Sequence, residues 1–175
     1  VRDAPGAQPL AVTAGTLRFE DVHFAYDPAR PILKGISFDV PAGRTIAIVG
    51  PSGAGKSTIS RLLFRFYDIQ AGKITIDGQD IAQVTQESLR RVIGMVPQDT
   101  VLFNDTVSYN IRYGRPSAAE EEVREAARLA QISGFVERLP DGYGAMVGER
   151  VLKLSGGEKQ RVAIARMFLK NPPIL

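Results

Sequence analysis

A glycine-rich segment from Gly50 to Ser57 has the composition of a loop that binds phosphate. Its sequence, Gly-Pro-Ser-Gly-Ala-Gly-Lys-Ser, matches the pattern of Gly, four residues, Gly-Lys and Ser or Thr. Glycines allow backbone turns and a close approach, so amide N–H groups can point at one anion. Lys56 would place a positive charge at the β- and γ-phosphates, and the Ser57 hydroxyl would be a ligand for Mg²⁺, which prefers oxygen. The alternative is a glycine-rich turn with a surface lysine.

The residues on either side of this loop predict the elements that must position it. Residues 45–49 form a continuous apolar run, which is typical of a buried parallel strand. Residues 57–66 carry apolar side chains at the spacing of an amphipathic helix. The order of strand, loop and helix is the one that phosphate binding needs. The residues expected to contact the nucleotide are Gly50, Pro51, Ser52, Gly53, Ala54, Gly55, Lys56 and Ser57.

A second glycine-containing segment, Leu154-Ser-Gly-Gly-Glu-Lys-Gln160, predicts another anion site. Ser155 and Glu158 have the spacing of a capping box at the start of a helix, whose N–H groups would be exposed at the two glycines between them. On this helix Val162, Ala165 and Leu169 share one face, whereas Lys159 and Arg166 are expected to reach solvent. The alternative is a helix cap and nothing more. Because the chain already has one phosphate loop, the second site should serve a partner's nucleotide.

Residues 154–160 resemble the signature sequence of ATP-binding cassette (ABC) ATPases. The resemblance implies that ATP and Mg²⁺ are the cofactors and that two cassettes pack head to tail. In that dimer each signature closes on the γ-phosphate held by the other cassette. The residues assigned to the partner's ATP are Ser155, Gly156, Gly157, Glu158 and Gln160.

The same resemblance assigns three further residues around the nucleotide. It places the Tyr26 ring against adenine and Thr58 at the α-phosphate. It also implies that Gln98 is the glutamine of the Q-loop, a catalytic residue together with Lys56 and a metal ligand together with Ser57. A flat aromatic face suits stacking, although Tyr26 also has the position of a core aromatic. Gln98 could instead be a solvated loop residue.

Other segments resemble ABC exporters, closest to the branch of mitochondrial iron–sulfur-related and heavy-metal-tolerance transporters. Gly148-Glu149-Arg150 resembles the exporter X-loop, in which Glu149 and Arg150 would contact the transmembrane domain, although Val151 stands where exporters commonly have glycine. Residues 98–114 resemble the groove that receives the coupling helices. An exposed charged loop is the alternative for residues 148–150.

The remaining sequence predicts strands followed by helices. The strands are expected at 17–26, with a break at Glu20-Asp21, and at 36–40, 72–78 and 91–96; a capping box at Ser117–Glu120 then opens a helix. The resemblance implies an α/β fold, a P-loop NTPase (ABC ATPase) core with an antiparallel β subdomain and an inserted helical subdomain, truncated before the Walker B strand. The expected layout is a linker over 1–14, then the nucleotide-binding domain over 15–175, divided into core and β subdomain (15–98), helical subdomain and X-loop (99–154) and signature helix (155–175).

Composition limits the other function classes. There is no cysteine and a single histidine, His23, which excludes disulfides and multi-histidine metal sites. A net charge of +3 spread over mixed charges gives no reason to expect nucleic acid as a partner. No stretch approaches the roughly 18–20 apolar residues that span a bilayer.

The sequence therefore predicts an ATP-hydrolysing cassette that powers export, at the cytoplasmic face of a plasma or inner membrane or at the matrix side of the mitochondrial inner membrane. Glutathione-linked metal or cluster species are the expected substrate class. The catalytic glutamate and the switch histidine should follow Leu175, so this fragment is expected to be inactive alone. The alternatives are a soluble ABC ATPase of DNA repair or translation and a regulatory cassette that binds ATP without hydrolysing it.

Overall fold

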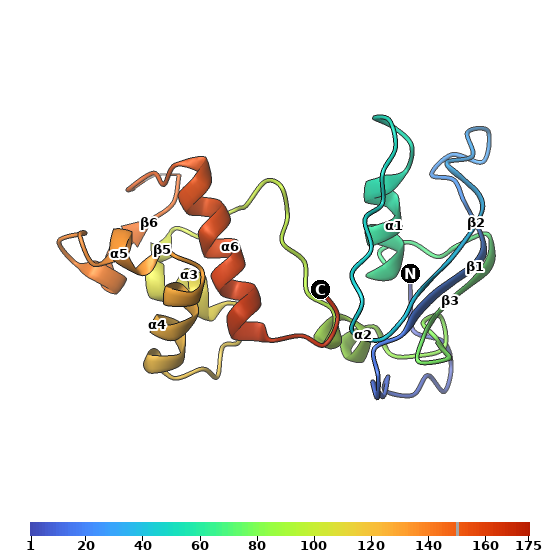
Figure 1. Cartoon of the computed structure of the whole chain (residues 1–175), viewed down its shortest axis with the longest axis horizontal. Helices are drawn as coiled ribbons and strands as arrows, with labels where there is room; N and C mark the ends of the chain where they lie inside the picture. Colours follow the sequence, from blue (N-terminus) through green and yellow to red (C-terminus); the bar gives the residue numbers. More distant parts are fainter. Residues whose placement is uncertain (150) are drawn as a thin grey trace. The chain divides into compact units, whose positions relative to one another are not determined.

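The computed structural model describes residues 1–149 and 151–175, and the chain divides into two compact units (Figure 1). Unit 1 comprises residues 1–93 with Ile174, and unit 2 comprises residues 94–173 with Leu175. Each unit has a hydrophobic core of its own.

Unit 1 is built on an antiparallel sheet with the strand order β2-β1-β3-β4. The strands are β1 Leu17–Phe24, β2 Leu33–Val40, β3 Ala71–Ile76 and β4 Gln79–Asp80. The expected break in β1 is confirmed, because the pairing register shifts between Phe19 and Val22 and Asp21 has a φ of 45°. Gly72 of β3 faces this bulge, and a Cβ there would lie 2.2 Å from the Asp21 carbonyl oxygen.

The helices α1 (Lys56–Leu63) and α2 (Gln86–Val92) complete unit 1. Alternation along β1 puts Phe19, Val22 and Phe24 into the core, where Leu62 of α1 and Leu89 of α2 are also buried. The helix expected over 57–66 therefore exists but ends at Leu63. The segment that carries the phosphate loop is thus anchored through α1 to the antiparallel sheet.

Two expected strands are not formed. Residues 45–49 carry no strand pairing among the described residues, and their apolar side chains are exposed, with Val49 at 86% of its surface. A parallel strand is buried only between neighbouring strands, and no described segment pairs with this one. The strand predicted at 91–96 is wrong in part. Arg91 and Val92 belong to α2, and within this range only Ile93 makes a β-bridge, to Ile174.

Residues 13–16 are held in unit 1 by the carboxylate of Asp77. Asp77 accepts hydrogen bonds from the N–H groups of Thr13, Ala14, Gly15 and Thr16, at 2.8 to 3.0 Å, and from the Thr16 hydroxyl at 2.7 Å. The hydrogen bond from Gly15 is the largest influence on its pKa; with the bonds from the neighbouring residues it outweighs desolvation and lowers the Asp77 pKa far below its ordinary value. The turn after β3 therefore fixes the path of residues 13–16.

Unit 2 is mainly helical. Its elements are β5 Asp105–Thr106, α3 Val107–Arg112, α4 Glu120–Leu129, α5 Ser133–Val136, the 3₁₀ helix η1 Gly142–Gly144, β6 Met146–Val147 and α6 Gly156–Lys170. The helices α3 and α4 pack on α6. Within residues 1–149 and 151–175, no helix combines the length and the apolarity needed to cross a bilayer.

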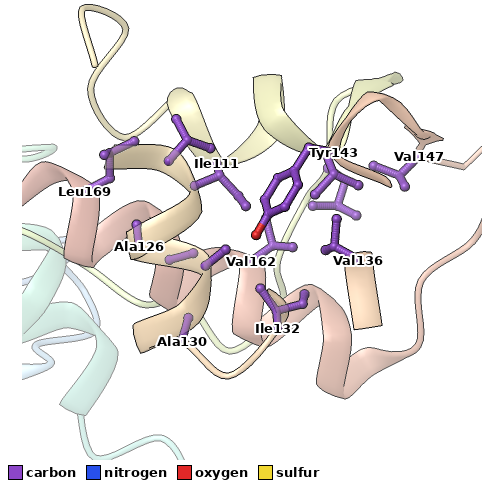
Figure 2. Close-up of a cluster of buried hydrophobic side chains, with 14 of the residues drawn as sticks. Ile111, Ala126, Ala130, Ile132, Val136, Tyr143, Val147, Val162 and Leu169 are labelled. Carbon is purple, nitrogen blue, oxygen red and sulfur yellow. The ribbon is translucent and has the colours of Figure 1, made fainter. Parts of the chain in front are cut away.

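The core of unit 2 lies between these helices (Figure 2). Val162 and Leu169 of α6 are buried in it together with Ile111 of α3 and Ala126 of α4, and Ala165 is also fully buried, which confirms the apolar face expected for α6.

The expected capping box at Ser117 is wrong. The helix α4 begins at Glu120 with Ala119 as its N-cap, and the Glu122 carboxylate accepts a hydrogen bond from the Ala119 N–H at 2.9 Å. Glu120 cannot serve the cap because its carboxylate accepts hydrogen bonds from Ser108 and Arg112.

Asp77→Asn should release residues 13–16 from unit 1. Removing the charge weakens at least four hydrogen bonds. We therefore expect the free energy that protects these amides against hydrogen exchange to fall by about 1–3 kcal/mol at pH 7. Since folding lowers the Asp77 pKa, its contribution is complete above the ordinary pKa of 3.8 and is lost as the pH falls below it. The difference between the two proteins should therefore shrink in acid; a difference that grows in acid would contradict this.

Candidate functional site

The phosphate loop of unit 1 has the backbone that its glycines predict. Gly53 and Gly55 have φ values of 83° and 87°, whereas Gly50 does not lie in the left-handed region. A Cβ on Gly55 would lie 2.9 Å from a methyl carbon of Leu33 and 3.0 Å from one of Ile32. Another residue at position 55 would therefore be strained and would push the loop away from the sheet.

Lys56 and Ser57 stand at the start of α1, where the first turn contains no acidic residue. The Lys56 ammonium donates to the carbonyl oxygens of Gly50 and Pro51, both at 2.7 Å, and so closes over the loop. Among the residues with described structure, no carboxylate forms an ion pair with Lys56. The helix dipole and this free positive charge favour an anion at the loop.

Tyr26 lies two residues beyond β1 and is brought against α1. Its hydroxyl is 3.4 Å from the Thr58 hydroxyl and accepts a hydrogen bond from Arg61 at 3.1 Å. The ring is 43% exposed, so it is not a core aromatic like Phe24. The structure thus brings Tyr26, Thr58 and the phosphate loop together in unit 1.

Gln98 and the second glycine segment belong to unit 2. Gln98 is exposed in an irregular stretch, with no hydrogen bond shown for its side chain in the described structure. Ser155 is the N-cap of α6, and the expected capping box is confirmed: its hydroxyl accepts from the Glu158 N–H at 3.3 Å, and the Glu158 carboxylate accepts from the Ser155 N–H at 2.7 Å. A Cβ on Gly156 or Gly157 would meet nothing within 4 Å.

The segments that resemble exporters are partly exposed. Glu149 lies on the surface, and Arg150 lies outside the described residues. An aromatic patch forms at Phe103, Tyr109 and Tyr113, where the Phe103 ring centroid is 4.6 Å from that of Tyr113 and 5.9 Å from that of Tyr109. Each of these rings is at least 39% exposed.

The expectation that Arg166 reaches solvent is wrong. Its guanidinium does not point into solvent but donates to the Asn110 carbonyl at 2.7 Å, to the Asn110 side-chain oxygen at 2.9 Å and to the Val101 carbonyl at 3.0 Å. It also lies 5.7 Å from the ring centroids of Phe103 and Tyr113. Asn110 is completely buried. Arg166 thus joins the aromatic patch to α6, the helix that begins at Ser155.

Comparison with known proteins identifies the family. The ABC transporter family profile matches residues 33–175. An ATM1-type heavy metal exporter of Novosphingobium aromaticivorans is 63% identical over 175 residues, which are the whole of this chain and 29% of that protein. The chain belongs to the ABC transporter family. Within this family, human ATP-binding cassette sub-family B member 6 is 62% identical over the whole chain and 21% of its own length.

A solved structure supports the same assignment for this ABC chain. A bacterial Atm1-family ABC exporter with ATP bound matches it with a TM-score of 0.95 and 63% identity, covering 98% of this chain and 30% of that one. The expected ABC ATPase fold class is therefore confirmed. The chain spans less than a third of the length of the relatives it matches.

Arg166→Met should loosen the aromatic patch from α6 in this ABC chain. The substitution removes three donated hydrogen bonds and leaves the buried Asn110 oxygen without one of its donors, a loss of about 2–3 kcal/mol. We expect the thermal unfolding midpoint, followed by circular dichroism, to fall by about 4–12 °C. Arg138→Met, at an exposed arginine of the same unit, is the matched control and should change it little. Equal midpoints for both variants would show that the Arg166 bonds do not stabilise unit 2.

Proposed function

We propose that this chain binds ATP at its phosphate loop and, in the full-length protein, takes part in ATP hydrolysis that powers export across a membrane. The observation that carries the proposal is the loop itself: Gly53 and Gly55 turn it in the left-handed region, and the Lys56 ammonium closes over it without a carboxylate partner among residues 1–149 and 151–175. An ATP polyphosphate would replace the two carbonyl oxygens at Lys56. Lys56 then stabilises the charge that develops on the γ-phosphate during transfer to water.

Mg²⁺ fits the oxygen donor at the start of α1. The Ser57 hydroxyl is exposed at the start of α1, and none of the hydrogen bonds found in the described chain uses it, so it is available as a ligand. The Gln98 side chain, which belongs to unit 2, has an amide oxygen of the kind that Mg²⁺ prefers, and we propose it as a second contact of the metal or of the attacking water on the resemblance to ABC cassettes. When bound, the metal neutralises phosphate charge, and the ligands that the protein must supply are few because Mg²⁺ keeps much of its water.

The signature residues 155–160 are proposed to contact ATP that a second cassette holds. Neither Gly156 nor Gly157 has a positive φ, and a side chain at either would meet no neighbour within the described chain. Glycine in the first turn lowers helix stability without any packing reason inside this chain. A partner that must approach the N–H groups of α6 closely supplies the missing reason.

The aromatic patch at Phe103, Tyr109 and Tyr113 is proposed as the surface for the coupling helices of a transmembrane domain, and Glu149 and Arg150 are proposed as further contacts. Its exposed rings suit burial against an apolar partner. Relatives named as a heavy metal exporter and as a mitochondrial iron–sulfur clusters transporter support a membrane exporter of metal or cluster species. We propose a glutathione-linked form of these species as the substrate class. The corresponding location is the cytoplasmic face of a plasma or inner membrane, or the matrix side of the mitochondrial inner membrane.

Lys56→Ala should abolish ATP turnover by the full-length protein. Loss of the cation over the phosphates should lower kcat by about 100-fold or more. The assay is phosphate release at saturating ATP, and Lys73→Ala, at an exposed lysine of β3, is the matched control. Turnover within a few-fold of wild type in the Lys56 variant would contradict the assignment of the phosphate loop.

Gly157→Asp should separate nucleotide binding from dimerisation. An aspartate in the first turn suits the helix dipole and should leave α6 folded, but it repels a γ-phosphate presented by a partner. We expect the affinity for a non-hydrolysable ATP analogue to stay within about two-fold at dilute protein, while nucleotide-dependent cassette closure and turnover are lost.

The matched control is Gly134→Asp, at a glycine of α5 that is also free of neighbours within 4 Å. Closure can be followed by cross-linking between the cassettes in the full-length protein. If Gly157→Asp leaves closure intact, or lowers analogue affinity as much as closure, the signature does not act on a partner's nucleotide.

A further inference from the structure

Two other aromatic side chains pack against the Tyr26 ring. Phe24 lies with its ring centroid 4.9 Å from that of Tyr26 at an interplanar angle of 88°, and Tyr67 lies at 5.0 Å and 81°. Both contacts are edge-to-face arrangements, which stabilise a ring in one orientation. Since Tyr26 is still 43% exposed, part of the ring surface is open to a ligand.

The Tyr26 hydroxyl is held by the helix of the phosphate loop. Arg61 donates to the phenol oxygen at 3.1 Å, and that hydroxyl can in turn donate to Thr58, whose oxygen is 3.4 Å away. Burial alone would raise the pKa of Tyr26, but the hydrogen bonds with Thr58 and Arg61 outweigh it and lower the pKa. Thr58 and Arg61 are three residues apart, so they lie on one face of α1.

The hydrogen bond to the Tyr26 hydroxyl is the main polar interaction of the Arg61 side chain. In the part of the chain with described structure, Arg61 forms no ion pair with a carboxylate, and the hydrogen bond to Tyr26 is the largest influence on its own pKa, which is raised. Arg61 lies five residues beyond Lys56, about 7.5 Å further along the helix axis from the loop. Its position therefore suits the tyrosine better than the phosphates.

We propose that Arg61 is a positioning residue for base binding: its guanidinium holds the Tyr26 ring in the orientation that receives the adenine of ATP. This inference rests on the proposed function and adds a residue to it. A ring that is already fixed loses little freedom when the base stacks on it, so the affinity for the base part of the nucleotide rises. Because α1 also begins with Lys56 and Ser57, one helix sets the positions of both the base-binding ring and the phosphate-binding loop.

Arg61→Met tests the proposal in the full-length protein, because methionine keeps much of the side-chain volume and removes the donor. Binding is measured for two probes, ATP and inorganic tripolyphosphate, which has no base. We expect ATP affinity to fall about 3- to 10-fold, the scale of one hydrogen bond, and tripolyphosphate affinity to stay unchanged. Tyr26→Phe should cause a similar loss of affinity for ATP and none for tripolyphosphate. Because both substitutions remove the same hydrogen bond, the ATP affinity of the double variant should lie within about two-fold of that of either single variant.

Arg18→Met is the matched control, since Arg18 is an exposed arginine of unit 1 whose partners are the surface acids Asp39 and Glu20. Unchanged ATP affinity in Arg61→Met would overturn the inference alone. Equal losses for ATP and tripolyphosphate would also overturn it, because Arg61 would then act on the loop or on the fold. A wild-type protein that binds tripolyphosphate but gains nothing from the base, or binds neither probe, would overturn the proposed ATP site itself.

Discussion

The contact between Gly55 and the side chains at the start of β2 fixes the geometry of unit 1. With a Cβ on Gly55 placed only 2.9 Å from Leu33 and 3.0 Å from Ile32, the loop can lie against the sheet only because this residue is glycine. The helix α1 starts immediately after it, and Leu62 then anchors the helix in the core. The position of α1 in turn brings Thr58 and Arg61 to Tyr26 at the end of β1. The proposed recognition of base and phosphate thus depends on one close approach.

Unit 2 depends on a polar contact in the same way. Asn110 is fully buried and uses its amide group to donate to the carbonyl oxygens of Phe103 and Thr106, both at 3.0 Å, while its side-chain oxygen accepts from Arg166. These bonds hold residues 101–106, which include β5, against α3 and α6. The aromatic patch is therefore connected through Arg166 to α6, the helix that begins at Ser155. A well-bonded connection of this kind suits the proposed role of the patch as a surface for coupling helices.

Local sequence rules predicted the features whose causes are local. The bulge at Asp21, the left-handed glycines of the phosphate loop and the Ser155–Glu158 capping box each depend on a few neighbouring residues. The prediction of a strand at 45–49 was wrong because a parallel strand needs neighbouring strands, and the apolar pattern of one segment does not show whether those neighbours are present. The cap at Ser117 failed because Arg112 and Ser108 compete for Glu120. Arg166 was misplaced because Asn110 lies 56 residues away in sequence, a distance that helical spacing does not reach.

The unpaired segment before the loop explains the contacts that Lys56 makes. Residues 45–49 have no strand ladder among the described residues, so α1 and the Gly55 contact restrain the loop from one end only. The Lys56 bonds to the Gly50 and Pro51 carbonyl oxygens, both 2.7 Å, restrain the other end. A polyphosphate that takes over the ammonium exchanges two neutral acceptors for charged ones, which form hydrogen bonds roughly twice as strong. Lys56 is exposed, so this exchange requires no buried charge to be uncovered.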